Sequence, residues 1–100
     1  MAGRPRNADP RARQAAATGL AIAALSFIAS EPERLGRFLA LTGIGPESIR
    51  AAASEPDFLL GVLDHLVSDE ALLLEFANEQ NIDPDDVARA RQALAGLLDV

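Results

Sequence analysis

The sequence of 100 residues contains no cysteine, tryptophan, tyrosine or lysine, and its only histidine is His65. The absence of cysteine excludes disulfide bonds, thiolate metal sites and a cysteine nucleophile. Few of the remaining side chains could transfer protons or form covalent intermediates near pH 7. These absences disfavour an enzyme, and we expect no catalytic residue, no cofactor and no metal ion.

Alanine and leucine together make up about a third of the chain, whereas isoleucine, valine and threonine are sparse. Small and straight-chain residues lose little rotamer freedom in a helix, so this composition is typical of an all-α protein. A chain of this length has room for one domain with one core. We therefore expect a single helical domain over residues 10–100.

The net charge of −6 is unevenly distributed. Residues 1–13 contain four arginines and one aspartate and carry +3, so the rest of the chain carries −9. An acidic body repels phosphate backbones, which makes nucleic acid an unlikely partner of the folded part. Residues 1–9 lack apolar periodicity and predict a flexible basic arm. The arginines of this region are Arg4, Arg6, Arg11 and Arg13.

The uncharged run 14–30 follows these arginines and has the outline of a signal peptide. Against that interpretation, the run is rich in alanine and no small-residue cleavage site precedes Glu31. It is also at the short limit for crossing a bilayer of ~30 Å. We therefore expect a core helix and no membrane partner.

An internal repeat at an offset of 38 residues is the most informative pattern, since Phe38 recurs as Phe76 and Pro46 as Pro84. The other identical pairs are Leu25/Leu63, Ser30/Ser68, Leu35/Leu73, Ile44/Ile82 and Ala52/Ala90. Periods of this size are typical of duplicated helical units. The pattern predicts an internal duplication with halves at about 20–53 and 58–91.

Helix-start and helix-stop signals divide the chain into five to six short helices, which predict a compact bundle. Asp9 and the serines Ser30, Ser54 and Ser68 are candidate N-caps, and Gly43 suits the left-handed position that ends a helix. The expected helices are 10–29, 32–42, 46–53, 56–67, 69–80 and 84–98. The first should bury a face made of Ala16, Leu20, Ala23, Ala24, Phe27 and Ile28.

The segment 56–67 has the widest apolar arc, about 200° at 100° per residue. Such an arc is typical of a helix packed on several sides, so we expect this helix at the centre of the bundle. Burying Phe58 or Leu63 is worth ~2–3 kcal/mol each. Replacing either by alanine should be among the costliest single changes.

The turn 41–46 resembles the hairpin of helix-hairpin-helix DNA-binding proteins, in which a Gly-hydrophobic-Gly turn presents backbone N–H groups to a phosphate. Gly43 and Gly45 would make that contact, supported by the arginines of the N-terminal region. The equivalent turn of the second repeat, 81–86, contains three aspartates, which cannot hold a phosphate. We favour a purely structural turn.

Other charged groups have structural interpretations. Asp83, Asp85 and Asp86 lack the spacing of a calcium loop and suit the first turn of a helix. His65 follows Asp64 directly, and adjacent helical residues point about 100° apart, so the pair cannot act as a base and its orienting group.

The segment 69–80 is the first candidate for an interaction surface. Leu74 falls outside the apolar face of this helix, and its repeat partner is Gly36. Acidic residues flank it, which is typical of a partner surface more than of a core. The candidate residues are Leu72, Leu74, Glu75 and Glu79.

The runs Glu33–Pro46 and Phe58–Phe76 resemble a family of short bacterial proteins catalogued as a domain of unknown function of the DUF3572 type. The resemblance covers about residues 18–95. It implies a compact helical, bacterial and cytoplasmic protein, and it implies no catalytic residue, cofactor or partner.

The leading hypothesis is a non-enzymatic helical protein-interaction module whose partner is another protein or a second copy in a homodimer. The alternative is a nucleic-acid-binding accessory protein that uses the 43–45 turn and the arginine arm. A third hypothesis, an enzyme subunit that contributes carboxylates to a partner's site, requires Asp64 or His65 to take part in chemistry.

Overall fold

The structure, a computed structural model, describes residues 10–98, and every regular element in that range is helical. The elements are α1 (Pro10–Ala29), α2 (Pro32–Thr42), the 3₁₀ turn η2 (Pro46–Ser48), α3 (Ile49–Ala52), α4 (Pro56–Val67), α5 (Glu70–Gln80) and α6 (Pro84–Leu98). The predicted all-α bundle is confirmed. The predicted basic arm 1–9, with Arg4, Arg6 and the cap Asp9, lies outside the described residues.

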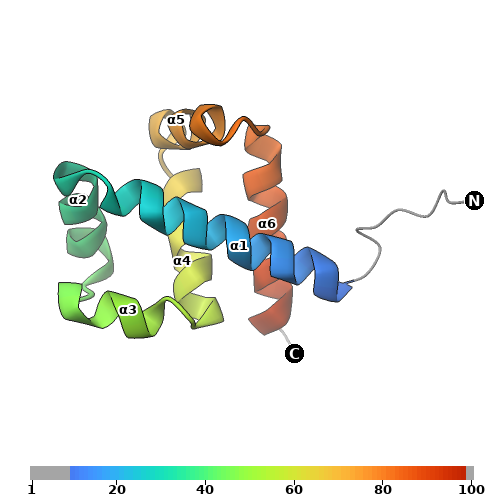
Figure 1. The fold of residues 1–100 in the computed structure, drawn as a ribbon, viewed down its shortest axis with the longest axis horizontal. Helices are drawn as coiled ribbons and strands as arrows, with labels where there is room; N and C mark the ends of the chain where they lie inside the picture. Colours follow the sequence, from blue (N-terminus) through green and yellow to red (C-terminus); the bar gives the residue numbers. More distant parts are fainter. Residues whose placement is uncertain (1–9, 99–100) are drawn as a thin grey trace, which may run out of the picture.

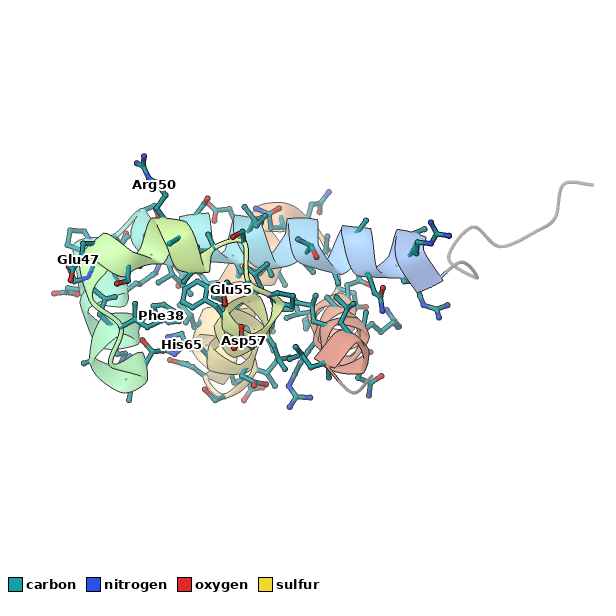
Figure 2. All side chains as sticks on the ribbon, turned by 90° about the horizontal axis from the view of Figure 1, so that it is seen from below. Phe38, Glu47, Arg50, Glu55, Asp57 and His65 are labelled. Atoms are coloured by element: carbon teal, nitrogen blue, oxygen red, sulfur yellow. The ribbon has the colours of Figure 1, made fainter. Side chains whose placement is uncertain are left out.

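Helix α1 lies across α4 and α6, and α5 joins these two helices at one edge of the molecule (Figure 1). Helices α2 and α3 close the end opposite the start of α1. Seen from below, α1 and α3 form one layer, and α2, α4 and α6 form the other (Figure 2). Helix α4 contacts α1, α5 and α6, so its predicted central position agrees with the packing.

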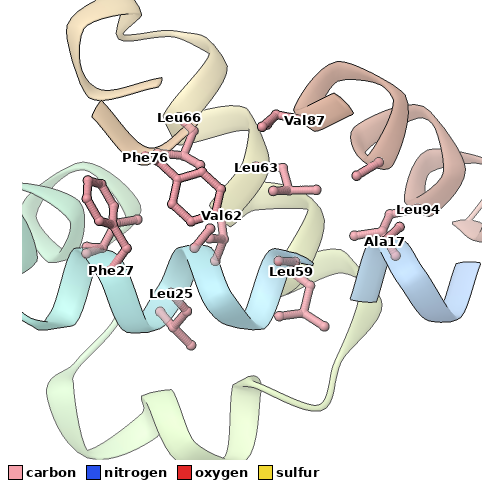
Figure 3. Close-up of a cluster of buried hydrophobic side chains, with 14 of the residues drawn as sticks. Ala17, Leu25, Phe27, Leu59, Val62, Leu63, Leu66, Phe76, Val87 and Leu94 are labelled. Atoms are coloured by element: carbon pink, nitrogen blue, oxygen red, sulfur yellow. The ribbon is translucent and has the colours of Figure 1, made fainter. Parts of the chain in front are cut away.

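The core lies between α1, α4 and α6, and Phe76 of α5 closes it on one side (Figure 3). Phe38 of α2 belongs to the same cluster. No polar or charged residue is buried among the described residues. Helix α4 contributes four buried residues, which is more than α2, α5 or α6 contributes. The largest fully buried side chains are Phe38, Phe76, Ile28, Leu59, Leu63, Leu66, Leu94, Val62 and Val87.

The buried face of α1 differs from the predicted one. Ala24, Phe27 and Ile28 are buried as expected, but Ala16 is exposed, and Leu20 and Ala23 are only half-buried. The centre of the buried face is instead Ala17, Ala21, Ala24 and Ile28. Small side chains at three of these positions let α1 pack closely against α4 and α6.

Two helices end at a residue in the left-handed conformation, as the sequence predicts for the first of them. Gly43 ends α2 with φ 74° and donates its N–H to the Leu39 carbonyl, and Asn81 ends α5 with φ 59°. A β-carbon is disfavoured in this region of φ, so glycine suits the first position.

Two glycine substitutions should have opposite effects on stability. Gly43→Ala should lower the free energy of unfolding by about 1 kcal/mol, because alanine is strained at φ 74°. Gly36→Ala should raise it by about 0.5–1 kcal/mol, because Gly36 lies inside α2 and a β-carbon there meets no atom within 4 Å. Urea denaturation of both variants tests this, and effects of the same sign would contradict it.

The three serines predicted as N-caps are not caps. The N-caps of α2 and α4 are Glu31 and Glu55, both extended, and each of these residues precedes a proline. Because the residue before proline is restricted to extended conformations, the helix boundary moves one residue past the serine. The serine hydroxyls donate instead to carbonyls three residues back: Ser30 to Phe27, Ser54 to Ala51 and Ser68 to His65.

The cap of α5 is Asp69, the residue after Ser68. Its Oδ1 accepts the backbone N–H of Leu72 at 3.2 Å. An aspartate side chain at this position is as good a cap as serine, and its charge also favours the positive end of the helix.

Helix boundaries agree with the predicted repeat offset of 38. Shifting α2, Pro32–Thr42, by that offset gives 70–80, the bounds of α5, and the end of α1 at Ala29 maps onto the end of α4 at Val67. Phe38 and Phe76 are both fully buried. The internal duplication itself stays a prediction.

The segment Arg11–Ala29 of α1 is long and apolar enough to cross a membrane, judged by length and composition, and no other described helix is. Core helices of globular proteins and signal sequences meet the same criterion. In this fold α1 contributes Ala17, Ala21, Ala24 and Ile28 to the core.

Candidate functional site

An apolar groove of about 490 Å³ lies between residues 12–20 of α1 and residues 82–93, which end within α6. Its lining is mostly alanine and aliphatic side chains, with three charged residues. We call it the α1–α6 groove; it is lined by Ala12, Arg13, Ala16, Ala17, Leu20, Ile82, Asp86, Arg89, Ala90 and Ala93.

The groove arises from alanines that face each other across two packed helices. Ala12 and Ala16 are four residues apart and therefore share a face of α1, and Ala90 and Ala93 share a face of α6. Small side chains on both walls leave a trough above the core, and Leu20 and Ile82 complete its apolar lining. A trough of this kind suits bulky side chains of a docked helix.

The charged lining of the groove has one more cation than anions. Arg13 belongs to α1, and Arg89 and Asp86 belong to α6. Asp86 Oδ1 accepts a hydrogen bond from Arg89 Nη1 at 2.7 Å in an ion pair of exposed groups. The three charges sum to +1, although the chain as a whole carries −6. An acidic partner therefore suits this lining better than a basic one.

The outer face of α5 carries the interaction residues predicted from the sequence. Leu74 is 49% exposed, and Glu75 and Glu79 are exposed beside it. Leu72 is half-buried and packs against the core, so it does not belong to the same face. We call the exposed face the α5 ridge; it consists of Glu70, Ala71, Leu74, Glu75, Asn78 and Glu79.

Residues of α2, α4 and α5 line a polar cleft of about 610 Å³. Arg34 is the best-buried charge in it: its Nη2 lies 2.6 Å from Glu75 Oε2, and its guanidinium lies 4.1 Å from the centre of the Phe27 ring. Arg37 lies 3.8 Å from Asp69. These two ion pairs connect α2 to the start and the middle of α5.

His65 lies at the edge of this cleft, against the ring of Phe38 (Figure 2). The two ring centroids are 5.2 Å apart and nearly perpendicular. Asp64 forms an ion pair with Arg91 of α6. Asp64 thus points to α6 and His65 to α2, which agrees with the prediction that these adjacent side chains point in different directions.

Burial lowers the pKa of His65 below its ordinary value of 6.5. The nearby carboxylate of Asp69 raises this pKa and the Arg37 guanidinium lowers it, and burial has the largest effect. The neutral imidazole is therefore favoured in the folded chain.

This pKa shift predicts a pH dependence of stability. In the unfolded chain His65 has its ordinary pKa of about 6.5, so below that pH it binds a proton more readily than in the folded chain. The free energy of unfolding should therefore fall as the pH falls from 6.5 towards the lowered pKa of the folded chain. His65→Gln should remove this part of the loss. Urea midpoints of both proteins at about pH 7.5 and about pH 5.5 measure it, and equal losses would contradict it.

The turn 43–45 is far from Arg11 and Arg13, the two arginines of the predicted phosphate site that the structure describes. Arg11 and Arg13 lie in the first turn of α1, whereas Gly43 and Gly45 lie between α2 and η2. The start of α1 and helix α2 lie at opposite ends of the molecule (Figure 1). A β-carbon at Gly45 would lie 2.7 Å from Glu47 Oε2, so a carboxylate lies over this glycine. A carboxylate in that place repels a phosphate.

The aspartates at the start of α6 bind backbone N–H groups, as the structural interpretation expects. Asp83 Oδ1 accepts from the Asp85 N–H at 2.9 Å, and Asp86 Oδ2 accepts from the Asp83 N–H at 3.1 Å. The two hydrogen bonds satisfy backbone N–H groups at the start of α6, in an arrangement close to a capping box. Over residues 10–98 no group of three or more His, Cys, Asp or Glu side chains is placed to hold a metal ion.

A family model described as "Protein of unknown function (DUF3572)" matches residues 14–97. No curated protein and no solved structure matches the chain. The family match covers α1 from its fifth residue, all the helices that follow, and α6 up to its penultimate residue. It therefore includes most of the α1–α6 groove and the whole α5 ridge, and the chain belongs to the DUF3572 family of proteins of unknown function.

Proposed function

We propose that this chain is a non-enzymatic protein-interaction module whose docking surface is the α1–α6 groove. The observation that carries the proposal is the apolar trough of about 490 Å³ between two packed helices. When apolar side chains of a partner helix enter such a trough, their surface is removed from water. This burial stabilises the complex by about 25 cal/mol per Å² of apolar surface.

The groove can receive a partner without rearrangement of the core. Ala12 and Ala16 are exposed, so the α1 wall already faces solvent. The floor is formed by Ala17 and Ala90, which are 2% and 8% exposed and belong to the rigid contact between α1 and α6. A preformed surface of this kind lowers the entropic cost of binding.

A photo-reactive amino acid placed at position 16 tests the proposal in cells that express the chain naturally. We expect a defined cross-linked protein from position 16 and none from position 40, an exposed alanine of α2 outside the groove. Adding Ala12→Trp, which fills the groove, should abolish the product from position 16. The same products from both positions would overturn the proposal.

A further inference from the structure

The α5 ridge and the α1–α6 groove have complementary shapes. The ridge presents one large apolar side chain, Leu74, with Ala71 and Asn78 one turn before and after it. The groove is a trough floored by alanines. A ridge with one bulky residue between two smaller ones fits a trough of this kind, as side chains of one helix fit between those of another.

The two surfaces also have opposite charges. Glu70 lies on one side of Leu74 on the helix and Glu79 lies on the other, whereas Glu75 already forms an ion pair with Arg34 of the same molecule. The groove lining carries Arg13 and Arg89 and one carboxylate, Asp86, which is ion-paired with Arg89. Apolar contact in the middle with carboxylates opposite guanidinium groups at the edges is the usual composition of a specific interface.

One molecule cannot bring its own ridge and groove together. Helix α5 is fixed to α4 and α6 by packing, and Leu72 and Phe76 hold its inner face on the core. The ridge therefore points away from the molecule that carries it. Contact between the two surfaces requires two molecules.

From these observations we infer that the occupant of the groove is the α5 ridge of a second copy of this chain. The inference rests on the proposed function, because it uses the same groove. The contact is heterologous: Leu74 of one copy enters the groove between α1 and α6 of the next. Since one helical face enters one trough, the contact is small, and the association is about micromolar or weaker.

Two substitutions block the two surfaces one at a time. Leu74→Arg places a cation on the ridge, which the apolar groove excludes and the arginines repel. Ala16→Trp fills the groove from an exposed position and leaves the ridge intact. The matched controls are Leu41→Arg, at a leucine that is 69% exposed on α2, and Ala40→Trp, at an exposed alanine outside the groove.

Sedimentation equilibrium over a wide concentration range tests the inference. We expect the wild type and both controls to associate, and each blocking variant alone to associate at least about tenfold more weakly. An equimolar mixture of Leu74→Arg and Ala16→Trp should recover a one-to-one complex, because the first keeps an intact groove and the second an intact ridge. Circular dichroism verifies folding, and Ala12→Trp replaces Ala16→Trp if that variant unfolds.

Three results would overturn self-association: a wild type that stays monomeric throughout, a blocking variant that associates as the wild type does, or a mixture that stays monomeric. The proposed function can be judged separately from self-association. If position 16 cross-links to a different protein while the wild type stays monomeric, the groove is a docking surface and the second copy is not its occupant.

Discussion

Phe76→Ala is expected to lower the free energy of unfolding by about 3–5 kcal/mol. Phe76 is fully buried, and its ring centroid lies 5.3 Å from that of Phe27 in a tilted arrangement. Phe27 in turn lies under the guanidinium of Arg34, which binds Glu75. Removing the ring therefore leaves a cavity where α1, α2 and α5 meet.

Thermal unfolding followed by circular dichroism measures this loss, and each kcal/mol should lower Tm by about 4–8 °C. Phe58→Ala is the matched control. The sequence predicts Phe58 among the costliest positions, but its side chain is only half-buried and meets Phe38 edge-on at 5.9 Å. Its loss should be clearly smaller, and equal losses at the two positions would contradict the packing described.

Leu63→Ala is expected to cost about 2–5 kcal/mol. Leu63 is fully buried at the centre of α4, the helix that contacts α1, α5 and α6. The surrounding helices cannot close the cavity independently, because each is held by its own contacts with α4. Leu74→Ala makes the same chemical change at a half-exposed position and should change stability by no more than about 0.5 kcal/mol.

Urea denaturation of the two leucine variants gives their free energies of unfolding, with slopes expected to stay unchanged. The two substitutions remove the same atoms from two helices of the same chain. The difference between their free energies of unfolding therefore measures the effect of burial. Similar losses for Leu63→Ala and Leu74→Ala would mean that α4 is not the centre of the core.

Helix boundaries could be predicted from the sequence because they depend on neighbouring residues. Proline fixes the first turn at Pro32, Pro56 and Pro84, and Gly43 takes the left-handed conformation expected of it. The serine caps were predicted wrongly for an equally local reason. The restriction on the residue before proline outweighed the capping preference of serine, so Glu31 and Glu55 became the N-caps.

The buried face of α1 was harder to predict, because alanine is compatible with both core and surface. Exchanging Ala16 for Ala17 at the core changes no hydrophobic pattern, yet it decides which alanine forms the buried floor of the groove and which forms its exposed wall. The groove joins residues 12–20 to residues 82–93, and the cleft joins Arg34 to Glu75. Such pairings depend on how the helices cross, for which local propensity contains no signal.

The exposure of Leu74 was easier to predict, because exposure on an amphipathic helix follows from its period. Leu74 lies outside the apolar face of α5 in both the pattern and the structure, where it is 49% exposed. Leu72 was predicted for the same surface, but it lies two residues before Leu74, and 100° per residue turns it towards the core.

The most direct test of the account is an NMR titration that asks which residues of the groove a partner touches. Isotope-labelled Leu74→Arg, whose groove is intact, receives unlabelled Ala16→Trp, whose ridge is intact. We expect concentration-dependent amide shifts at Ala12, Ala16, Leu20 and Ala93, with the labelled α5 unaffected. Absence of shifts, or shifts confined to residues outside the α1–α6 groove, would contradict it.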